Sequence, residues 1–349
     1  MKKNVVSALI LSAALISGVS VHADEREDAL KSLNSLKIIT GYEDGTMREN
    51  DLLTYGEAAK MLRSMMNQNS FLGHVGIFTE TEEGLTAEEI ADRSHWANEY
   101  ISFLQEIRVM KNGIRPDDNI TYSELCNMLI RLLGYEDEAE VKTSGDEMYM
   151  LEAYCLGLVG NADFDPSLRS PYYGYIENIT RGEAAKIINR ALDVPRKMIY
   201  EYSIKDGYKK RIEKDNTFRN ILNKSIPAKE ETETDGRKLF DFSKFETLRY
   251  PHERSLRSDG NNSIQLENDE SKIIIYTSGK DSGLYDYYIS LKMYDNDETR
   301  TYKYRLCRIG PFSPGEISIT DLKPDSKYDV MISTVPGSCE IDGKVIAAK

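Results

Sequence analysis

The chain has 349 residues and carries 58 acidic against 45 basic side chains, a formal net charge of -13. This acidity argues against nucleic acid as a partner, because nucleic-acid binding depends on clustered Lys and Arg. A chain of this length is expected to form two or three domains of about 100–200 residues each.

The first residues have the pattern of a secretory signal peptide. Lys2 and Lys3 precede an apolar stretch from Val5 to Val19, and Val21-His22-Ala23 places small residues where a signal peptidase cleaves. The stretch is too short to span a bilayer comfortably, and no later segment is long and apolar enough to cross a membrane. We therefore expect residues 1–23 to be a signal peptide, and the mature chain to be secreted and held outside by binding alone.

A short motif recurs three times, at Leu53–Glu57, Ile120–Glu124 and Ile179–Glu183. Each copy has an apolar residue, then Thr, then Glu three places later, which is the spacing of a helix capping box. In that box the Thr hydroxyl accepts from the backbone amide at the Glu position, and the Glu side chain reaches back to the Thr amide. Apolar residues one, four, five and eight places beyond each Glu form a single helical face.

A second, earlier helix recurs before each motif and is followed by a turn. Each unit therefore reads as helix, irregular loop and capped helix. Because such a pair cannot bury its apolar stripe alone, three units are expected to pack into one all-α domain. The expected boundaries are 24–69, 95–140 and 141–195 for the three units, with a linker at 70–94.

Several local motifs together resemble S-layer homology repeats, over roughly Asp24 to Pro195. They are His95-Trp96-Ala97, Ile38 to Thr46, Arg115-Pro116-Asp117-Asp118, Leu133-Gly134-Tyr135 and Ile179 to Ala185. The resemblance implies a pseudo-trimer whose grooves, between neighbouring repeats, bind a secondary cell-wall polysaccharide that is pyruvylated or otherwise acidic. It also implies attachment to the cell wall or cell surface of a Gram-positive-type bacterium.

In that family an Arg in the first turn of the second helix projects toward an acidic sugar. Only the third unit has it, as Arg181, while Tyr55 and Tyr122 occupy the equivalent places. A helix N-terminus offers free amides and a positive dipole, and a guanidinium adds a forked pair of donors. We therefore expect one strong groove, at Arg181. The alternative is that all three units are scaffold.

Three further features near the motifs have two interpretations each. Trp96 is either a core residue of the second unit, which we favour, or a platform for a sugar ring. Tyr172 and Tyr173 belong either to a carbohydrate shelf beside Arg181 or to an ordinary packed loop. Glu57, Glu124 and Glu183 read as caps rather than ligand contacts. The candidate polysaccharide contacts are Arg181, Gly182, Glu183, Tyr55, Tyr122, Trp96, Tyr172 and Tyr173.

The C-terminal half has a different pattern. Residues 196–260 are charged and weakly periodic, which predicts a linker or a small irregular subdomain. Residues 261–349 contain seven short β-like runs with turn signals, which predict an all-β sandwich. The runs are Ser263–Glu267, Lys272–Thr277, Tyr285–Tyr294, Thr301–Arg308, Glu316–Thr320, Lys327–Thr334 and Glu340–Ala347. Leu322 to Val330 resembles the E–F corner of a fibronectin type III or immunoglobulin-like domain, where the Tyr328 hydroxyl would bond to backbone upstream.

No catalytic or cofactor motif stands out. The chain has no nucleophile elbow, phosphate loop, dinucleotide fingerprint or metalloprotease helix. Its cysteines form no CxxC pair, so a zinc site is not expected. Cys126 and Cys155 are expected to be buried thiols, and Cys307 and Cys339 either pair or stay free. We expect no enzymatic activity, no metal and no cofactor.

Three hypotheses for function follow. The first is a wall-bound surface protein whose β domain is a spacer or an adhesive module. The second is a wall-tethered enzyme acting on glycans or peptidoglycan through its C-terminal half. The third is an assembly module whose repeats recognise a protein partner. None of the three involves nucleic acid, or a membrane after signal cleavage.

Overall fold

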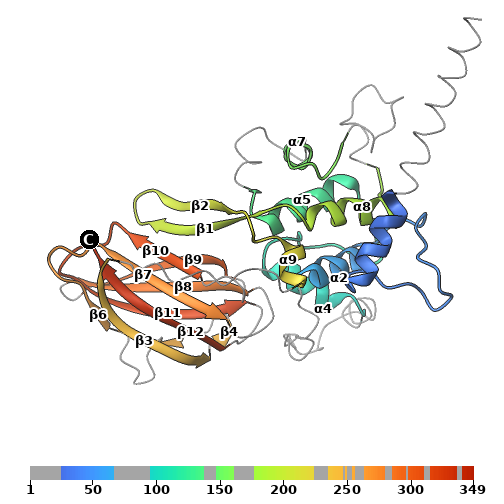
Figure 1. Ribbon diagram of the computed structural model, residues 1–349. Helices are drawn as coiled ribbons and strands as arrows, with labels where there is room; N and C mark the ends of the chain where they lie inside the picture. The colour runs from blue at the N-terminus through green and yellow to red at the C-terminus, as the bar shows by residue number, and fades with distance from the viewer. Residues whose placement is uncertain are drawn as a thin grey trace, which may run out of the picture.

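The structure is a computed structural model with a helical N-terminal body and a sheet-rich C-terminal body (Figure 1). It describes residues 25–66, 95–136, 147–160, 177–223, 235–246, 248–249, 254–255, 263–279, 285–295, 298–309, 315–335 and 340–349. The expected signal peptide and the linker at 70–94 lie outside these residues. Within the described part of the chain, no helix has the length and hydropathy needed to cross a membrane.

Up to Pro195, the described residues of the helical body form a first helix at residues 25–35 and five further helices. These are α2 (Tyr55–Met65), α4 (Asn98–Glu106), α5 (Tyr122–Leu133), α7 (Glu147–Cys155) and α8 (Arg181–Ala191). The three predicted capped helices are confirmed, because Thr54, Thr121 and Thr180 are the N-caps of α2, α5 and α8. Each Thr hydroxyl accepts from the amide three residues on, which satisfies a donor that the helix leaves open.

The capping box is complete in two of these three helices. In α2 and α5 the side chains of Glu57 and Glu124 reach back to the cap amides, as predicted. In α8 the prediction is wrong for Glu183, whose carboxylate instead pairs with Lys186 and with Arg26 of the first helix. The reason is burial, because Lys186 is only 2% exposed and a buried ammonium requires a counter-charge.

The segments before the three capped helices are joined by a closed ring of backbone hydrogen bonds. The amide of Leu53 donates to the carbonyl of Ile179, that of Ile179 to Ile120, and that of Ile120 to Leu53, at 2.9, 3.0 and 3.0 Å. All three side chains are fully buried. The ring therefore fixes the three helix starts against one another at the centre of a single core, which draws residues from the first helix and from all five named helices of this body.

The seven predicted β runs are all strands. They are β6 (Ser263–Gln265), β7 (Lys272–Gly279), β8 (Tyr285–Asp295), β9 (Glu298–Ile309), β10 (Gly315–Thr320), β11 (Lys327–Val335) and β12 (Glu340–Ala348). One sheet has the order β2-β1-β10-β7-β12-β3, and the other has the path β4-β11-β8-β9, with β5 and β6 also pairing with β11. The core of this body is filled by Ile, Val, Leu and aromatic side chains of both sheets, with the Tyr328 side chain fully buried.

The predicted tie of Tyr328 to upstream backbone is confirmed. Its hydroxyl accepts from the amide of Lys323 at 2.8 Å and lies 3.4 Å from the carbonyl of the same residue. A buried phenol requires such partners, since an unpaired hydroxyl inside a core costs free energy. This contact therefore fixes the corner that leads into β11.

Residues 196–260 do not form a linker over their described part. They contain β1 (Arg196–Ser203), β2 (Gly207–Glu213), α9 (Phe218–Leu222), β3 (Arg237–Glu246), β4 (Leu248–Arg249) and β5 (Arg254–Ser255). β1 pairs in parallel with β10, and β3 pairs with β12, so both belong to the first sheet. The charged composition concealed them because β2 and β3 are the two edge strands, where charged side chains face solvent.

The two bodies are joined through the β1–β2 hairpin and α9 (Figure 1). Phe218 and Ile221 of α9 are buried in the core of the helical body. Tyr135, just after α5, donates from its hydroxyl to the carbonyl of Pro195 at 2.8 Å, and Lys210 of β2 donates to the carbonyl of Gly134 at 3.2 Å. The same hairpin thus belongs to the sheet and packs on the end of α5.

The two cysteines whose side chains the structure describes differ in exposure. Cys126 is buried as predicted, whereas Cys155 is exposed, contrary to expectation, because it ends α7 on the side away from the core. The side chains of Cys307 and Cys339 lie outside the described residues.

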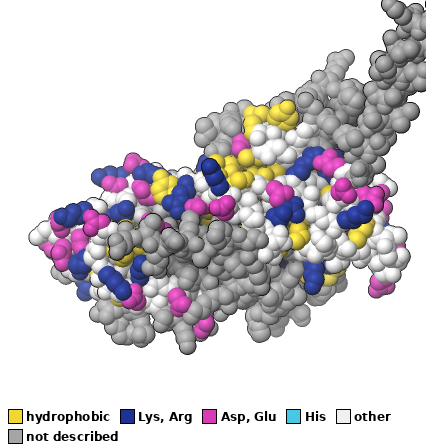
Figure 2. Space-filling model, viewed as in Figure 1, with side chains coloured by type: hydrophobic (Ala, Val, Ile, Leu, Met, Phe, Trp, Pro, Cys, Tyr) yellow, Lys and Arg dark blue, Asp and Glu magenta, His cyan; other side chains and the backbone are white. Residues whose placement is uncertain are grey.

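On the face shown in Figure 2, Lys and Arg side chains lie beside Asp and Glu side chains on both bodies. Among the described residues of that face, acidic side chains are therefore interspersed with basic ones.

Candidate functional site

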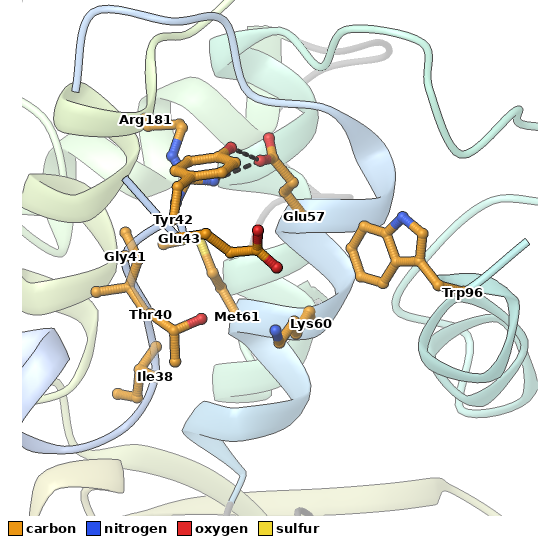
Figure 3. A pocket seen from close by; sticks show the side chains of 11 residues that line it. Ile38, Thr40, Gly41, Tyr42, Glu43, Glu57, Lys60, Met61, Trp96 and Arg181 are labelled. Atoms are coloured by element: carbon orange, nitrogen blue, oxygen red, sulfur yellow. Dashed lines mark hydrogen bonds and ion pairs between the residues drawn. The ribbon is translucent and has the colours of Figure 1, made fainter. Parts of the chain in front are cut away.

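A cavity of about 320 Å³ opens where four parts of the helical body meet (Figure 3). Its walls are the turn after the first helix, the first two turns of α2, Trp96 just before α4, and Arg181 at the start of α8. The lining residues are Ile38, Ile39, Thr40, Gly41, Tyr42, Glu43, Glu57, Lys60, Met61, Trp96 and Arg181. A cavity of this volume lies within the range that small ligands occupy in proteins.

Arg181 is largely buried and binds groups of the protein through Nε and Nη1. It is 5% exposed, and its Nη1 lies 2.6 Å from Oε1 of Glu57. Its Nε donates to the carbonyl of Met47 at 3.1 Å, and its guanidinium carbon lies 4.9 Å from the centre of the Tyr42 ring. These contacts hold the turn at Tyr42 and Met47 to the start of α8. The Arg181 guanidinium therefore links two segments of the cavity wall.

The carboxylate of Glu57 accepts hydrogen bonds from three donors in this wall. Its Oε1 accepts from the Tyr42 hydroxyl and from Arg181, while Oε2 accepts from the amide of Thr54 at 3.2 Å. Burial and the hydrogen bond to Glu57 raise the pKa of the Tyr42 phenol, which therefore stays protonated as a donor. One carboxylate thus caps α2 and also fixes two lining side chains.

The amides at the start of α8 are not free, contrary to expectation. The amide of Arg181 donates to the carbonyl of Asp51 at 2.9 Å, that of Gly182 to Glu49 at 2.8 Å, and that of Glu183 to the Thr180 hydroxyl. A β-carbon on Gly182 would lie 3.0 Å from the carbonyl oxygen of Glu49, so this glycine allows the close approach. Ligand recognition in the cavity therefore falls to side chains rather than to helix amides.

Trp96 is not the core residue that we favoured from the sequence. It is 53% exposed and lies at the rim of the cavity. The residue after it, Ala97, is completely buried and donates from its amide to Nδ1 of His95 at 3.1 Å. A β-carbon on Gly56 would lie 2.7 Å from that of Ala97 and 3.5 Å from Cζ2 of Trp96, so the indole lies against the start of α2 while about half of it stays exposed.

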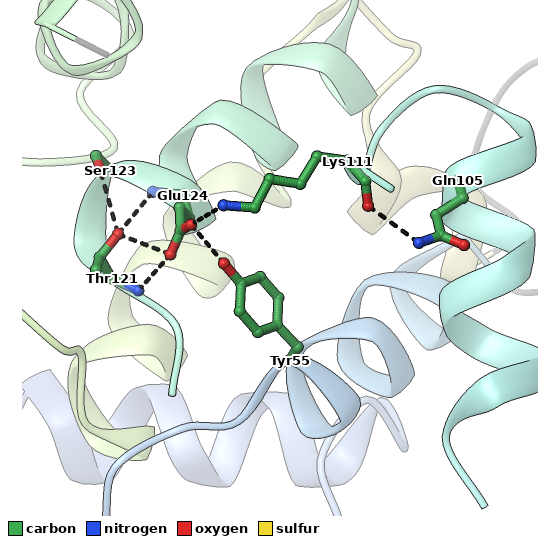
Figure 4. Close-up of polar contacts among 6 residues, drawn as sticks. All are labelled: Tyr55, Gln105, Lys111, Thr121, Ser123 and Glu124. Atoms are coloured by element: carbon green, nitrogen blue, oxygen red, sulfur yellow. Dashed lines mark hydrogen bonds and ion pairs between the residues drawn. The ribbon is translucent and has the colours of Figure 1, made fainter. Parts of the chain in front are cut away.

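The next pair of capped helices repeats the arrangement with different residues (Figure 4). Tyr55 stands where Arg181 stands in α8, and its hydroxyl donates to Oε1 of Glu124. Lys111 donates to the same oxygen at 2.5 Å and lies 5.7 Å from the centre of the Tyr55 ring. Burial and the bond to Glu124 raise the pKa of Tyr55 to about 12, so it remains a donor. At this junction the positive charge is thus supplied by Lys111, a lysine of the protein whose side chain is exposed.

Replacing Glu124 with Gln should test this junction through its pH dependence. Burial opposes the charged form of Glu124, but the bonds from Lys111, Tyr55 and Thr121 outweigh it and hold its pKa below the ordinary 4.5. The stabilisation is therefore present above pH 4.5 and lost as the pH falls through the lowered value. Since Gln also caps, we expect the variant to unfold about 1 kcal/mol more easily than the parent near neutral pH, and the gap to close in acid.

The measurement for this variant is urea unfolding followed by far-UV circular dichroism at about pH 7 and about pH 3.5. Comparing variant with parent at each pH cancels the titration of all other carboxylates. A gap that stayed constant between the two pH values would show that the charge of Glu124 is not involved.

The remaining candidate residues either lie away from this cavity or are not among the residues that the structure describes. Glu183 is held in its ion pairs with Arg26 and Lys186, and Tyr55 belongs to the junction with Glu124. Tyr122 is half-buried against the helical core, and its amide donates to the carbonyl of Glu177 at 3.1 Å. Tyr172 and Tyr173 lie outside the described residues. The cavity therefore unites Arg181 with Trp96, whose positions in the sequence are far apart.

Of the eleven lining residues, only Arg181 and Trp96 were sequence-based candidates, and two of those missed carry polar groups that matter for the site. Tyr42 belongs to the Gly-Tyr turn and carries the hydroxyl that meets Glu57. Lys60 follows Glu57 by one turn of α2, so the helical period that placed Glu57 also placed Lys60 on the same face. The spacing of three residues between Glu57 and Lys60 could therefore have identified Lys60 from the sequence.

Comparison with known protein families identifies a segment of the helical body. Residues 19–59 match the family model of the S-layer homology domain. The matched segment contains the first helix, the Tyr42 turn and the start of α2 with Glu57, and so includes two walls of the cavity. S-layer homology domains are modules that anchor proteins at the cell wall or cell surface. The search of curated proteins gave no match.

Proposed function

This chain carries an S-layer homology domain, and from that premise we propose that it is an exported, non-catalytic protein held on a bacterial cell wall by a polysaccharide. The cavity lined by Tyr42, Trp96 and Arg181 is the binding groove, and its ligand is an acidic secondary wall polymer. The observation that carries the proposal is this cavity, which opens in the same body as the matched segment.

The architecture that we propose is three repeats arranged as a pseudo-trimer. The closed ring of hydrogen bonds among Leu53, Ile120 and Ile179 supports it, because each of the three units contributes one donor and one acceptor. The paired carboxylates support it as well, since Arg181 reaches Glu57 as Tyr55 reaches Glu124. Each contact joins the start of one capped helix to the capping Glu of another.

The C-terminal body is proposed to be a spacer or an adhesive module with an immunoglobulin-like or fibronectin III-like sandwich. Its support is the pair of sheets that share a core and the Tyr328 corner. The contacts of Tyr135 and Lys210 with the opposite body would transmit the position of the anchor to this module. The proposed export rests on the leader pattern at residues 1–23, followed by cleavage and attachment to a Gram-positive-type wall.

Binding to purified cell walls tests the proposal. The chain without residues 1–23 is mixed with peptidoglycan sacculi that retain their secondary polymer, and with matched sacculi stripped of it by acid. We expect the protein to sediment with the first preparation and to stay in solution with the second. Equal sedimentation with both, or with neither, contradicts a polysaccharide anchor. The same sample, incubated with glycan and peptidoglycan substrates, should show no turnover.

A further inference from the structure

We propose that Lys60 and Trp96, rather than Arg181, make the charged and stacking contacts with the glycan, and that they read an anionic sugar residue. The inference rests on the function proposed above and assigns roles within the groove. Arg181 is then a positioning residue, which holds Tyr42 and Glu57 in the wall.

The first step is the state of Arg181. A 5% exposed guanidinium that already binds Glu57 and the Met47 carbonyl has its charge compensated inside the protein. An anionic ligand would have to displace Glu57, which would leave a largely buried carboxylate without its partner. Breaking a buried ion pair in this way is strongly unfavourable. In Figure 3 the Tyr42 ring lies across Arg181, so the guanidinium is also in contact with an aromatic face of the wall.

The second step is the state of Lys60. It lies on α2 in the wall of the cavity and is half-buried, and no carboxylate among the described residues pairs with it. Its Nζ lies 5.9 Å from the centre of the Trp96 ring, at the limit of a cation–π contact. Its stem can pack along the wall while the ammonium stays at the opening. Lys60 is thus the lining cation whose charge an anionic ligand can meet at little cost.

The third step is the state of Trp96. An indole that is 53% exposed beside a cavity presents an apolar face, and the apolar face of a sugar ring is its natural complement. Its position is fixed from below, since Ala97 is completely buried and Gly56 allows α2 to approach it closely. Figure 3 shows Lys60 and Trp96 on the same side of the cavity, away from the Arg181 cluster. One sugar residue can therefore contact both.

A third lining residue, Glu43, is predicted to weaken the binding of an anionic ligand. Glu43 is exposed and lines the same cavity, where its charge opposes an anionic ligand. Removing that charge should strengthen binding, whereas removing the charge of Lys60 should weaken it. This opposition distinguishes recognition of an anion from general loss of the groove.

Trp96 is the only tryptophan of the chain, so intrinsic fluorescence reports on the groove directly. The probe is soluble polymer released from sacculi by dilute acid, titrated into the protein lacking residues 1–23. We expect saturable change in the emission of Trp96 over the concentration range in which the polymer competes with sacculi. Binding to sacculi with unchanged emission overturns the inference while leaving the proposed anchor intact, and failure to bind sacculi defeats the anchor itself.

Substitutions then separate the roles. Lys60→Gln and Trp96→Ala should each weaken sacculus binding about tenfold, and Lys60→Arg and Trp96→Phe should restore most of it. Glu43→Gln should strengthen binding about threefold. The double variant Glu57→Gln with Arg181→Gln keeps a cap and removes both charges together, so any loss of binding that it causes through the wall should be equal on native polymer and on polymer without anionic groups.

Two results overturn the assignment. One is a double variant that folds, by circular dichroism, yet loses binding while Lys60→Gln retains it, because Arg181 would then be the cation that meets the ligand. The other is an equal effect of Lys60→Gln on native polymer and on polymer whose carboxylates have been reduced to alcohols and whose phosphates have been removed. The Trp96→Ala effect should persist on that neutral polymer.

Discussion

Replacing Gly134 with Ala is expected to destabilise the protein by about 2–5 kcal/mol. Gly134 ends α5 with a φ of 88°, a left-handed conformation that costs other residues about 1–2 kcal/mol. An added β-carbon would also lie 2.1 Å from the carbonyl oxygen of Lys197 in β1, and overpacking of this kind costs about 1–3 kcal/mol. Because backbone meets backbone there, neither side can move away without separating β1 from the end of α5.

The chain offers a matched control in Gly113. It has a φ of 75°, but a β-carbon added there would meet no atom within 4 Å. Gly113→Ala should therefore show only the conformational cost of about 1–2 kcal/mol. Urea unfolding, followed by far-UV circular dichroism and by Trp96 fluorescence, measures both variants. Equal losses for the two would mean that β1 does not pack on the end of α5.

The local features of the fold were readable from the sequence because their causes are local. A Thr followed three residues later by Glu sets the start of a helix within one turn, so Thr54, Thr121 and Thr180 were found as caps. The same holds for the β runs after residue 261, whose turn signals and alternation lie within a few residues. Because the motif occurs three times, it also predicted that three such helices share one core.

Features that depend on distant partners were not readable. Glu183 has the spacing of a cap, but it turns to Arg26, which lies far from it in the sequence, near the start of the helical body. β1 and β2 look like charged linker until β10 provides the pairing edge. The hydroxyl of Tyr328 was predictable by contrast, since its partner Lys323 is five residues away. Sequence distance between partners thus separates the successes from the errors.

The groove shows the same division at the level of single side chains. Arg181 and Trp96 were both candidates. Only the tertiary structure shows that Arg181 is paired with Glu57 and that Trp96 is exposed. The pattern Thr-Arg-Gly-Glu fixes where Arg181 begins a helix and carries no information on the carboxylate that meets it. A residue type that fits acidic sugars is therefore a weaker guide to ligand contact than its state of pairing in the fold.

The ring at the centre of the helical body gives the second large prediction. Leu53→Ala should lower the free energy of unfolding by about 2–5 kcal/mol, because the side chain is 0% exposed and its loss leaves a cavity. The site also joins two hydrogen bonds of the ring, to Ile179 and from Ile120. Since Thr54 and Glu57 follow directly, loosening Leu53 should also loosen the wall that holds Arg181.

The neighbouring residue Leu52 provides the control, with the same side chain at the next position and 42% of it exposed. Leu52→Ala should change the free energy of unfolding by no more than about 0.5 kcal/mol. Urea unfolding gives both values, and sacculus binding at a temperature where both variants are folded gives the effect on the groove. If the two substitutions had equal effects, Leu53 would not lie at the centre of a packed core. If Leu53→Ala lost stability and kept full binding, the ring and the groove would be energetically independent, and the wall at Glu57 would be held by its own contacts with Tyr42 and Arg181.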